Sequence, residues 1–336
     1  MVLLAGSFGG GAACVGDYCA TGDPHCDVLG RYVALYQPEQ PTEPTVPTWV
    51  AVASSGGIAY SNDGASWSNE SLGGDNLQGV AYGSAGFVAV GNNGRVLTST
   101  SGQIGTWVDR TPPTAQVLSS IAYSDGLYVA VGGTTASNDL ILTSTDGVTW
   151  TDRSLGLADF FRTMIHTENG FLSVGRSGVR ATSPDGLTWT DASAGGLDWR
   201  AVAFGNSLYI QDDGGGNLHT SATTGGLPNA TGNVTPSANS ESALFFEPVG
   251  LFIFGGDDGR IVSTADGVGT ATLVDNTSSE LKGDAATDGS RIVFASDLGE
   301  LAHADSDLNF TYQTIGAANW NGVTYGAVPE SLLTNP

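Results

Sequence analysis

The sequence contains very little positive charge. Of its 336 residues, 11 are Lys or Arg and 34 are Asp or Glu, so the formal net charge is −23, and Lys282 is the single lysine. A surface this acidic repels polyanions, and we therefore expect no binding to nucleic acid. Long apolar runs are missing as well: none approaches the ~20 residues that span a bilayer, so we expect no membrane insertion.

Cysteine is scarce and confined to one short stretch. The three cysteines, Cys14, Cys19 and Cys26, lie close to His25. Three thiols and an imidazole could hold a structural zinc ion, but this spacing matches no established zinc motif. One disulfide with a spare thiol, or three free thiols, are the alternatives. The four residues are kept as a metal candidate, and nothing else in the sequence indicates a cofactor.

The composition lacks the runs of Leu, Glu and Lys that build helices. It holds 49 glycines and 40% hydrophobic residues, with many Ser and Thr. This balance favours many short strands joined by tight turns, and therefore an all-β fold.

A unit of about 40 residues is repeated along the chain, as in GVAYGSAGFVAVGNNGRVLTST. Each copy contains about four short apolar segments separated by turn residues. Copies begin at Gly79, Ser120, Thr163, Ala201, Ala243 and Gly283, and the fragment GVTYGAV begins at Gly322. This period, with four strands per unit, is typical of the blades of a β-propeller.

The two ends of the repeat region complement each other. The segment 49–73 lacks the first strand of the unit, and the segment 322–328 is that strand alone. We therefore predict that the two ends pair in one composite blade, which also hides sheet edges. Six complete units and this composite blade give a seven-bladed β-propeller over residues 49–328, followed by a C-terminal tail, residues 329–336.

A phrase of the form Ser-x-Asp-Gly-x-x-Trp occurs three times, as SNDGASW, STDGVTW and SPDGLTW. The aspartates can accept hydrogen bonds from N–H groups just ahead, the glycines supply a positive φ, and the indoles can pack against a neighbouring blade. A catalytic group is normally present once, so the repetition indicates a structural turn between the third and fourth strands. The residues are Asp63, Gly64 and Trp67; Asp146, Gly147 and Trp150; and Asp185, Gly186 and Trp189.

These phrases resemble the Asp-box, or BNR, repeat of sialidases and of many non-enzymatic propellers. The surrounding cadence is also similar to that of Ycf48-like assembly propellers. The resemblance covers nearly the whole chain after Trp49 and implies the fold more than an activity, because one scaffold serves many functions. Sialidases bind their substrate carboxylate with three arginines and carry an Arg-Ile-Pro motif, which is missing here. We therefore expect no enzymatic activity, with a sialidase-like glycosidase as an alternative.

One set of residues is a candidate binding site. The positions just before the innermost strands are all polar, and they should surround one mouth of the central channel: Gln78, Ser119, Arg162, Arg200, Ser242, Lys282 and Asn321. One residue earlier stand the aromatics Phe161, Trp199 and Trp320. The set predicts a pocket for an anionic or glycan ligand. Alternatively, Arg162, Arg200 and Lys282 only neutralise Asp159, Asp198 and Glu280, and the aromatics cap the core.

The residues before the propeller do not fit the repeat. Residues 37–48 are Pro-rich and predict a stiff extended linker, and residues 1–36 precede it as an arm. A Gly- and Pro-rich arm of this kind is expected to become ordered only within an assembly, so we interpret it as a docking element.

Together these features predict a non-enzymatic structural or attachment protein of a virion, such as a phage tail or capsid appendage. The propeller would bind a host-surface glycan or protein, and residues 1–48 would contact other virion proteins. The expected location is the virion surface or the extracellular space. An assembly factor similar to the Ycf48-like proteins is the other alternative, although a basic patch would be expected for it and the chain is acidic.

Overall fold

The computed structural model describes residues 43–111, 113–134, 138–226, 229–233, 240–277, 279–281, 283–316 and 318–333. The chain divides into two units, Met1–Pro44 and Thr45–Pro336. All the described strands belong to the second unit, which is all-β apart from short 3₁₀ turns.

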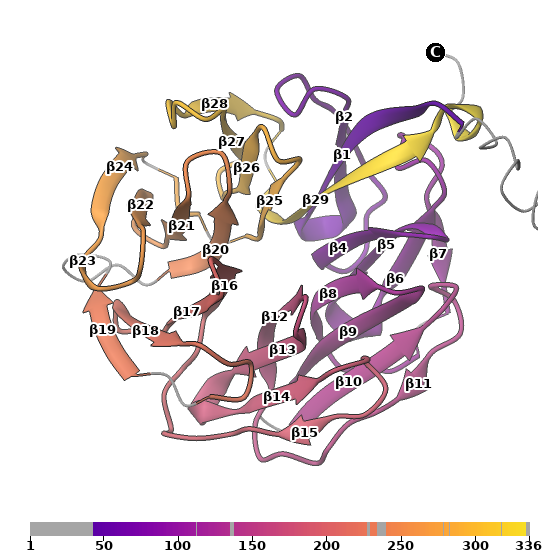
Figure 1. Cartoon of the computed structure of the whole chain (residues 1–336). Coiled ribbons are helices and arrows are strands. Elements are labelled where there is room, and N and C mark those ends of the chain that lie inside the picture. Colours follow the sequence, from indigo (N-terminus) through magenta and orange to yellow (C-terminus); the bar gives the residue numbers. More distant parts are fainter. Residues whose placement is uncertain are drawn as a thin grey trace, which may run out of the picture. The chain divides into compact units, whose positions relative to one another are not determined.

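Seven antiparallel sheets form a ring, and we number these blades in chain order (Figure 1). Each innermost strand contacts the innermost strand of the next blade. The first three blades, each from its innermost strand outwards, are β4 (Leu77–Gly83), β5 (Gly86–Gly91), β6 (Val96–Ser99) and β7 (Val108–Arg110); β8 (Leu118–Ser124), β9 (Leu127–Thr134), β10 (Asn138–Ser144) and β11 (Thr151–Asp152); and β12 (Phe161–Thr167), β13 (Gly170–Gly175), β14 (Arg180–Ser183) and β15 (Thr190–Asp191).

The remaining four blades follow the same plan. They are β16 (Ala201–Gly205), β17 (Leu208–Asp212), β18 (Asn217–Ser221) and β19 (Asn229–Asn233); β20 (Ser240–Phe246), β21 (Leu251–Gly256), β22 (Arg260–Thr264) and β24 (Thr272–Asn276); β25 (Ala285–Thr287), β26 (Ile292–Ala295), β27 (Glu300–Ala304) and β28 (Thr311–Thr314); and β29 (Trp320–Pro329), β1 (Thr45–Ala53), β2 (Gly57–Ser61) and β3 (Ser68–Ser71). The short strand β23 (Gly269–Thr270) of blade 5 pairs in parallel with β19 and gives blade 4 a fifth strand.

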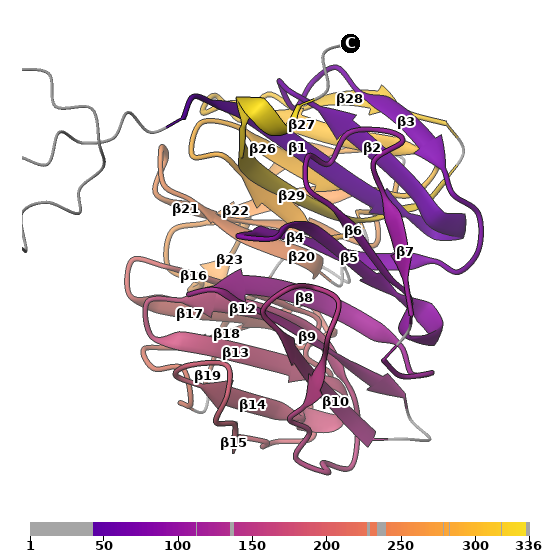
Figure 2. The same ribbon diagram turned by 90° about the vertical axis from the view of Figure 1, so that its right-hand side faces the viewer.

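The composite blade 7 confirms the predicted pairing of the two chain ends. Strand β29 lies against β1 from Thr45↔Pro329 to Val52↔Gly322, as both views of the ribbon show (Figures 1 and 2). Strand β1 begins at Thr45, so the last residues of the predicted linker are part of the blade. Pro47 is tolerated because its carbonyl accepts from Asn62 Nδ2 at 2.8 Å, on the β2 side of the strand, so the missing N–H also points away from β29, and β2 pairs with β1 only from Trp49 onwards.

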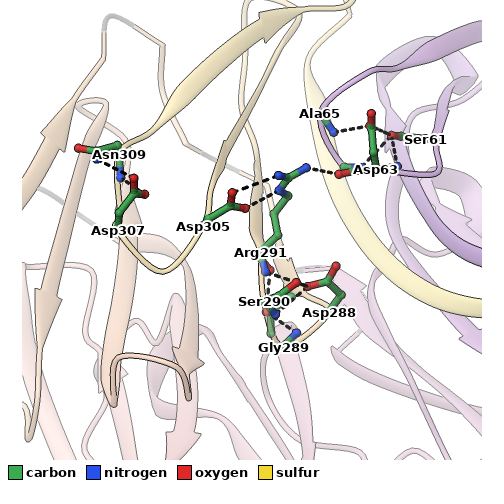
Figure 3. Close-up of polar contacts among 12 residues, drawn as sticks. Ser61, Asp63, Ala65, Asp288, Gly289, Ser290, Arg291, Asp305, Asp307 and Asn309 are labelled. Carbon is green, nitrogen blue, oxygen red and sulfur yellow. Dashed lines mark hydrogen bonds and ion pairs between the residues drawn. The ribbon is translucent and has the colours of Figure 1, made fainter.

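Arg291 of blade 6 connects that blade to the composite blade 7 (Figure 3). Its Nε donates to Asp305 Oδ1 of the same blade at 2.8 Å, and its Nη1 donates to the main-chain oxygen of Asp63 in blade 7. The hydrogen bond to Asp305 raises the pKa of Arg291. The guanidinium therefore ties the last complete blade to the turn of the composite blade.

The core lies between the blades. All six residues of β5 are buried, because one face of a blade packs against the preceding blade and the other against the following one. Between blades 1 and 2, for example, Val90 and Val96 pack against Tyr128, Ala130 and Leu142. A strand covered on both faces needs an apolar residue at every position, which explains runs such as FVAV in place of strict alternation.

Short 3₁₀ turns join the second and third strands of blades 7, 1 and 3. These are η1 (Ser54–Gly56), η2 (Asn92–Gly94) and η3 (Arg176–Gly178), and a further one, η4 (Glu330–Leu332), follows β29. The first three turns, η1, η2 and η3, lie at the end of the ring where the innermost strands begin. There Asn92 of η2 accepts a hydrogen bond from Gln78 Nε2 at 3.0 Å.

Candidate functional site: the mouth of the central channel

The innermost strands begin around a pocket of about 240 Å³. Five of the seven residues predicted to surround the channel mouth line it, and Glu241 joins them. We call this set the channel mouth: Gln78, Ser119, Arg162, Arg200, Glu241 and Asn321. Ser242, predicted in place of Glu241, lines the channel below instead, and Lys282 lies outside the described residues.

A repeated β-bulge explains why these residues line the channel mouth and why Glu241 is there in place of Ser242. In five innermost strands the pairing register skips one residue, and the skipped residues are Gln78, Ser119, Arg162, Glu241 and Asn321. A bulged residue is not opposed by a partner and its side chain is re-aimed out of the sheet, here towards the mouth. In blade 5 the skip falls between Ser240 and Ser242, one residue before the position that repeat alignment indicates. The sequence alone carries no signal for that one-residue difference.

The two arginines of the mouth come from adjacent blades and have acidic neighbours. Arg200 Nη1 forms an ion pair with Glu241, and Arg162 Nη2 lies 3.7 Å from Asp198. The guanidinium of Arg162 also lies 5.6 Å from the ring centroid of Phe160. The predicted neutralisation by Asp198 is thus present for Arg162.

The other predicted acidic partners are arranged differently. Asp159 lies 4.0 Å from Arg176, which the sequence analysis did not select, and accepts a hydrogen bond from Ser177 Oγ at 2.8 Å. Glu280 accompanies Lys282 in the sequence, and that lysine is not among the described residues. Internal neutralisation therefore accounts for part of the charge at the mouth.

Both arginines keep unused hydrogen-bonding capacity. Arg162 Nε and Arg200 Nε are buried and have no hydrogen-bond partner in the described part of the chain. Burial lowers the pKa of Arg162, and the positive charge of Arg200 lowers it further. The two positive charges at the mouth therefore repel each other. In addition, each buried N–H donor without a partner costs about 1–3 kcal/mol. An incoming acceptor would relieve both effects.

The mouth opens into a channel cavity of about 270 Å³ lined by the innermost strands of all seven blades. Asp284 and Glu241 line both the cavity and the mouth, together with hydroxyl groups such as that of Thr163. Burial raises the pKa of Asp284 to about 7. Below that pH the carboxyl group of Asp284 is mostly neutral, whereas Glu241, which lines the same pocket, is paired with Arg200.

The three aromatic residues predicted beside the mouth are buried and are not available to a ligand in the mouth. Phe161, Trp199 and Trp320 are 0%, 2% and 1% exposed. Phe161 and Trp320 occupy the place that Leu77 and Leu118 occupy in blades 1 and 2, just before the bulged residue, and Trp199 precedes Arg200 at the start of blade 4; these leucines are also buried. The side chain before the bulge points between two blades, so the interpretation that these aromatics cap the core is the one that fits.

The Ser-x-Asp-Gly-x-x-Trp phrases form tight turns after the third strands of blades 7, 2 and 3. In the first, Asp63 Oδ1 accepts from the N–H groups of Ala65 at 2.8 Å and Ser66 at 2.6 Å, while Ser61 Oγ accepts from Gly64 N at 2.9 Å. The same bonds recur around Asp146 and Asp185. The three glycines have φ values of +67°, +70° and +73° in the order Gly64, Gly147 and Gly186.

The indoles of these phrases pack between blades. Trp189 is buried among residues of blades 2 and 3, such as Val131 and Phe171. Trp67 and Trp150 are half-buried and pack in the same way against the preceding blade. The phrase therefore performs two structural tasks, closing a hairpin and attaching it to its neighbour.

The remaining predictions about ligands concern the arm. Cys14, Cys19, His25 and Cys26 lie outside the described residues, so the zinc candidate stays a prediction. Among the residues that the structure describes, no group of three or more His, Cys, Asp or Glu side chains is placed to hold a metal ion. In that same part of the chain no helix is long and apolar enough to cross a membrane.

A closed ring of seven antiparallel blades defines the protein as a seven-bladed β-propeller. Among solved structures, the chain is similar to YCF48 bound to D1 peptide, with 16% identity, a TM-score of 0.60 and coverage of 80% of this chain and 93% of that one. It is also similar to YCF48 from Cyanidioschyzon merolae, with 18% identity, a TM-score of 0.50 and coverage of 70% and 84%.

A third similar structure is the computationally designed Ika8 protein, with 14% identity, a TM-score of 0.58 and coverage of 83% of this chain and 90% of that one. No protein-family model matches the sequence, and no curated protein sequence matches it either. At these identities the likeness establishes the propeller fold and nothing about ligands.

Proposed function

We propose that the protein is a non-enzymatic binding module of the Asp-box propeller type, which captures an anionic group of a glycan or protein at the channel mouth. The observation that carries this proposal is the meeting of Arg162 and Arg200 in one pocket, each with a buried Nε that has no partner in the described residues. Guanidinium groups bind carboxylates and phosphates with paired hydrogen bonds. The small pocket suits one sugar ring or one carboxylate-bearing side chain.

The acidic body sharpens this choice of ligand. With a net charge of −23, the chain repels anions over most of its surface, so long-range attraction is not what selects the ligand. Recognition then depends on short-range contacts inside the pocket, where water is partly excluded and each charged hydrogen bond is stronger. A ligand with one anionic group on a largely neutral body, such as an acidic sugar, fits this requirement best.

Binding of acidic ligands by the wild-type protein, compared with a mouth variant, tests the proposal. Isothermal titration with N-acetylneuraminate, glucuronate and a short peptide ending in a free carboxylate should show binding of at least one probe. The double variant Arg162→Ala/Arg200→Ala should lose about tenfold or more in affinity, because both charged donors are removed. The control Arg260→Ala removes an arginine on β22, away from the mouth lining, and should bind as wild type does. Equal binding by wild type and the mouth variant, or no binding to any probe, would overturn the proposal.

The proposed setting is a virion appendage that attaches to a surface, with the segment before Thr45 contacting other virion proteins. Its support is the sequence pattern alone: a docking-type arm, a displayed propeller and an acidic body. Electron microscopy of native particles with an antibody against the propeller tests this placement. Labelling absent from intact particles would refute it.

An assembly factor that holds a peptide is the second candidate. The likeness to YCF48 bound to D1 peptide favours it, since an anionic peptide group would use the same arginines. In the titration, binding of either sugar would argue against an assembly factor, and binding of the carboxylate-ending peptide alone would favour it over a glycan-binding module.

Glycosidase activity is the alternative that the carboxyl groups lining the mouth bear on most directly. Glycoside hydrolysis needs an acid and a carboxylate on either side of the bond, and Asp284 and Glu241 line one pocket. We propose that they are not catalytic, because Glu241 is paired with Arg200 and no third arginine joins the mouth in the described part of the chain. Turnover of a fluorogenic sialoside or glucuronide that is abolished by Asp284→Asn would contradict this.

A further inference from the structure

The interface between blades 3 and 4 departs from the apolar pattern of the other blades. In blade 1, Val96 pairs with Val90, and the residue paired with Val174 at the same place in blade 3 is Arg180. In blade 2, Ala130 pairs with Leu142, and the corresponding pair in blade 4 is Gln211 and His219. Val96, Ala130 and Leu142 pack together between blades 1 and 2, and Arg180, Gln211 and His219 occupy the equivalent positions between blades 3 and 4.

Contacts across this interface agree with the comparison of blades. Arg180 Nη2 donates to two carbonyl oxygens of blade 4, those of Gly226 at 3.0 Å and Thr224 at 3.4 Å. Val174, the strand partner of Arg180, packs against Trp199. The Trp199 ring meets the His219 ring edge-on, with centroids 5.1 Å apart. Arg180, Trp199 and His219 therefore lie at the same interface, where Gln211 is the strand partner of His219, and we call these four residues the polar cluster.

The cluster contains many buried polar atoms without partners. Arg180 and Gln211 are both 0% exposed. Among the described residues, no hydrogen-bond partner exists for Arg180 Nε and Nη1, Trp199 Nε1, His219 Nδ1 or either amide atom of Gln211. Buried polar groups are almost always hydrogen-bonded in native proteins, so this concentration indicates an additional bound species.

The positive charge of Arg180 indicates which kind of species is bound. Arg180 has no charged partner within the described part of the chain, and residues 227–239, which follow Gly226 in the sequence, include no Asp or Glu. Asp213, the carboxylate beside His219, already accepts hydrogen bonds from Gly215 N, Asn217 N and Nδ2, and His219 Nε2. Burial lowers the pKa of Arg180, but a guanidinium keeps its proton at any ordinary pH. Within the described residues, a positive charge is therefore buried without a counter-charge to offset its desolvation.

We propose that the interface between blades 3 and 4 holds a small inorganic anion, such as chloride, bound by Arg180 with Trp199 Nε1 and the Gln211 amide as further donors. An anion satisfies these N–H groups and neutralises the guanidinium at the same time. Water molecules would satisfy the hydrogen bonds but leave the charge uncompensated. The site is separate from the channel mouth and does not depend on the proposed function.

Anomalous diffraction from wild-type crystals grown in sodium bromide tests the site directly. An anomalous peak is expected between blades 3 and 4, within contact distance of Arg180, and should be missing in crystals of Arg180→Val. Valine is the residue at the equivalent position of blade 1, so this variant retains the packing of the fold. A bromide map with no peak at Arg180 would overturn the proposal and leave only water in the cluster.

Thermal unfolding gives a second readout in solution. At constant ionic strength, replacing gluconate by chloride should raise the melting temperature of the wild type by a few degrees, because a ligand that binds only the folded state stabilises it. The variant Arg180→Val/Gln211→Ala, which introduces the residues found at the equivalent positions of blades 1 and 2, should show no change in melting temperature with chloride. Arg162→Ala/Arg200→Ala should keep the full response, since it leaves this interface intact. Equal responses in wild type and the interface variant would contradict the proposal.

Discussion

The indole of Trp49 packs against the phenol ring of Tyr325, with ring centroids 5.2 Å apart and planes tilted by 56°. The two residues are 276 positions apart in the sequence and directly opposite in the ladder between β1 and β29. Trp49 is fully buried, and its cluster includes Val293 and Leu301 of blade 6. One indole thus joins both chain ends and the neighbouring blade.

We expect Trp49→Ala to destabilise the propeller by about 3–5 kcal/mol, the range for truncating a buried large aromatic residue. Trp67→Ala, at the same interface but half-buried, should cost distinctly less. Urea unfolding followed by circular dichroism measures both. Equal losses would show that closure of the ring does not depend on Trp49.

Gly147→Ala should destabilise the protein by about 2–4 kcal/mol, because two penalties combine. The residue has φ of +70°, and an added Cβ would meet Val88 Cγ2 at 2.6 Å. Gly126→Ala is the matched control, with φ of +83° and nothing within 4 Å of the added atom. Its loss should be limited to backbone strain of about 1–2 kcal/mol. Similar losses in the two variants would mean that the turn does not hold blade 2 against blade 1.

Acid should weaken the turns through their aspartates. Hydrogen bonds from the N–H groups of Thr149 and Val148 lower the pKa of Asp146 to about 2, from an ordinary value of 3.8. The charged form is favoured in the folded state, so its contribution is present above pH 3.8 and is lost as the pH falls towards 2. The free energy of unfolding should fall over this range, and Asp146→Asn should make the fall shallower. The change is small because the carboxylate is exposed to solvent.

Ionisation of a buried aspartate, Asp212, should lower the stability of the fold as the pH rises. Burial raises the pKa of Asp212 to about 7, although the N–H of Gly214 partly opposes the shift, and the residue is 0% exposed. The unfolded chain loses this proton near pH 4 and the folded chain only near 7, so stability should decline between these values and level off above them.

Asp212→Asn should remove the contribution of Asp212 to that decline, leave the contribution of Asp284, and stabilise the protein at pH 8 by up to about 4 kcal/mol. An asparagine keeps an acceptor for Gly214 N and can donate to Ser240 Oγ, which now donates to Asp212 Oδ2 at 3.3 Å. Urea unfolding at pH 4, 6 and 8 measures the profile. Parallel profiles for the variant and the wild type would refute the assignment.

Glu241→Gln should tighten the binding of small carboxylates at the channel mouth by about three- to tenfold, because it frees Arg200 from its internal ion pair. Ser242→Ala, at the next residue, changes the channel lining and should leave affinity unchanged. Isothermal titration with glucuronate compares the two variants. Weaker binding by Glu241→Gln would show that Glu241 contacts the ligand itself.

The sequence by itself determined the number of blades, the sharing of blade 7 and the character of the turns. These features depend on local chemistry: an Asp-Gly turn bonds to residues two and three positions away, and a strand covered on both faces must be apolar throughout. The period and the complementary ends then leave a closed ring as the arrangement that pairs every strand.

Only the tertiary structure decided which side chains reach the mouth and which are buried. A bulge shifts the register by one residue, so Glu241 lies at the mouth and Ser242 lies below it. Trp199 and Arg180 carry polar N–H groups that are common at protein surfaces, but both side chains are buried between two blades. Their environments depend on a neighbouring blade about 40 residues away in the sequence, and a one-residue change in register redirects every side chain.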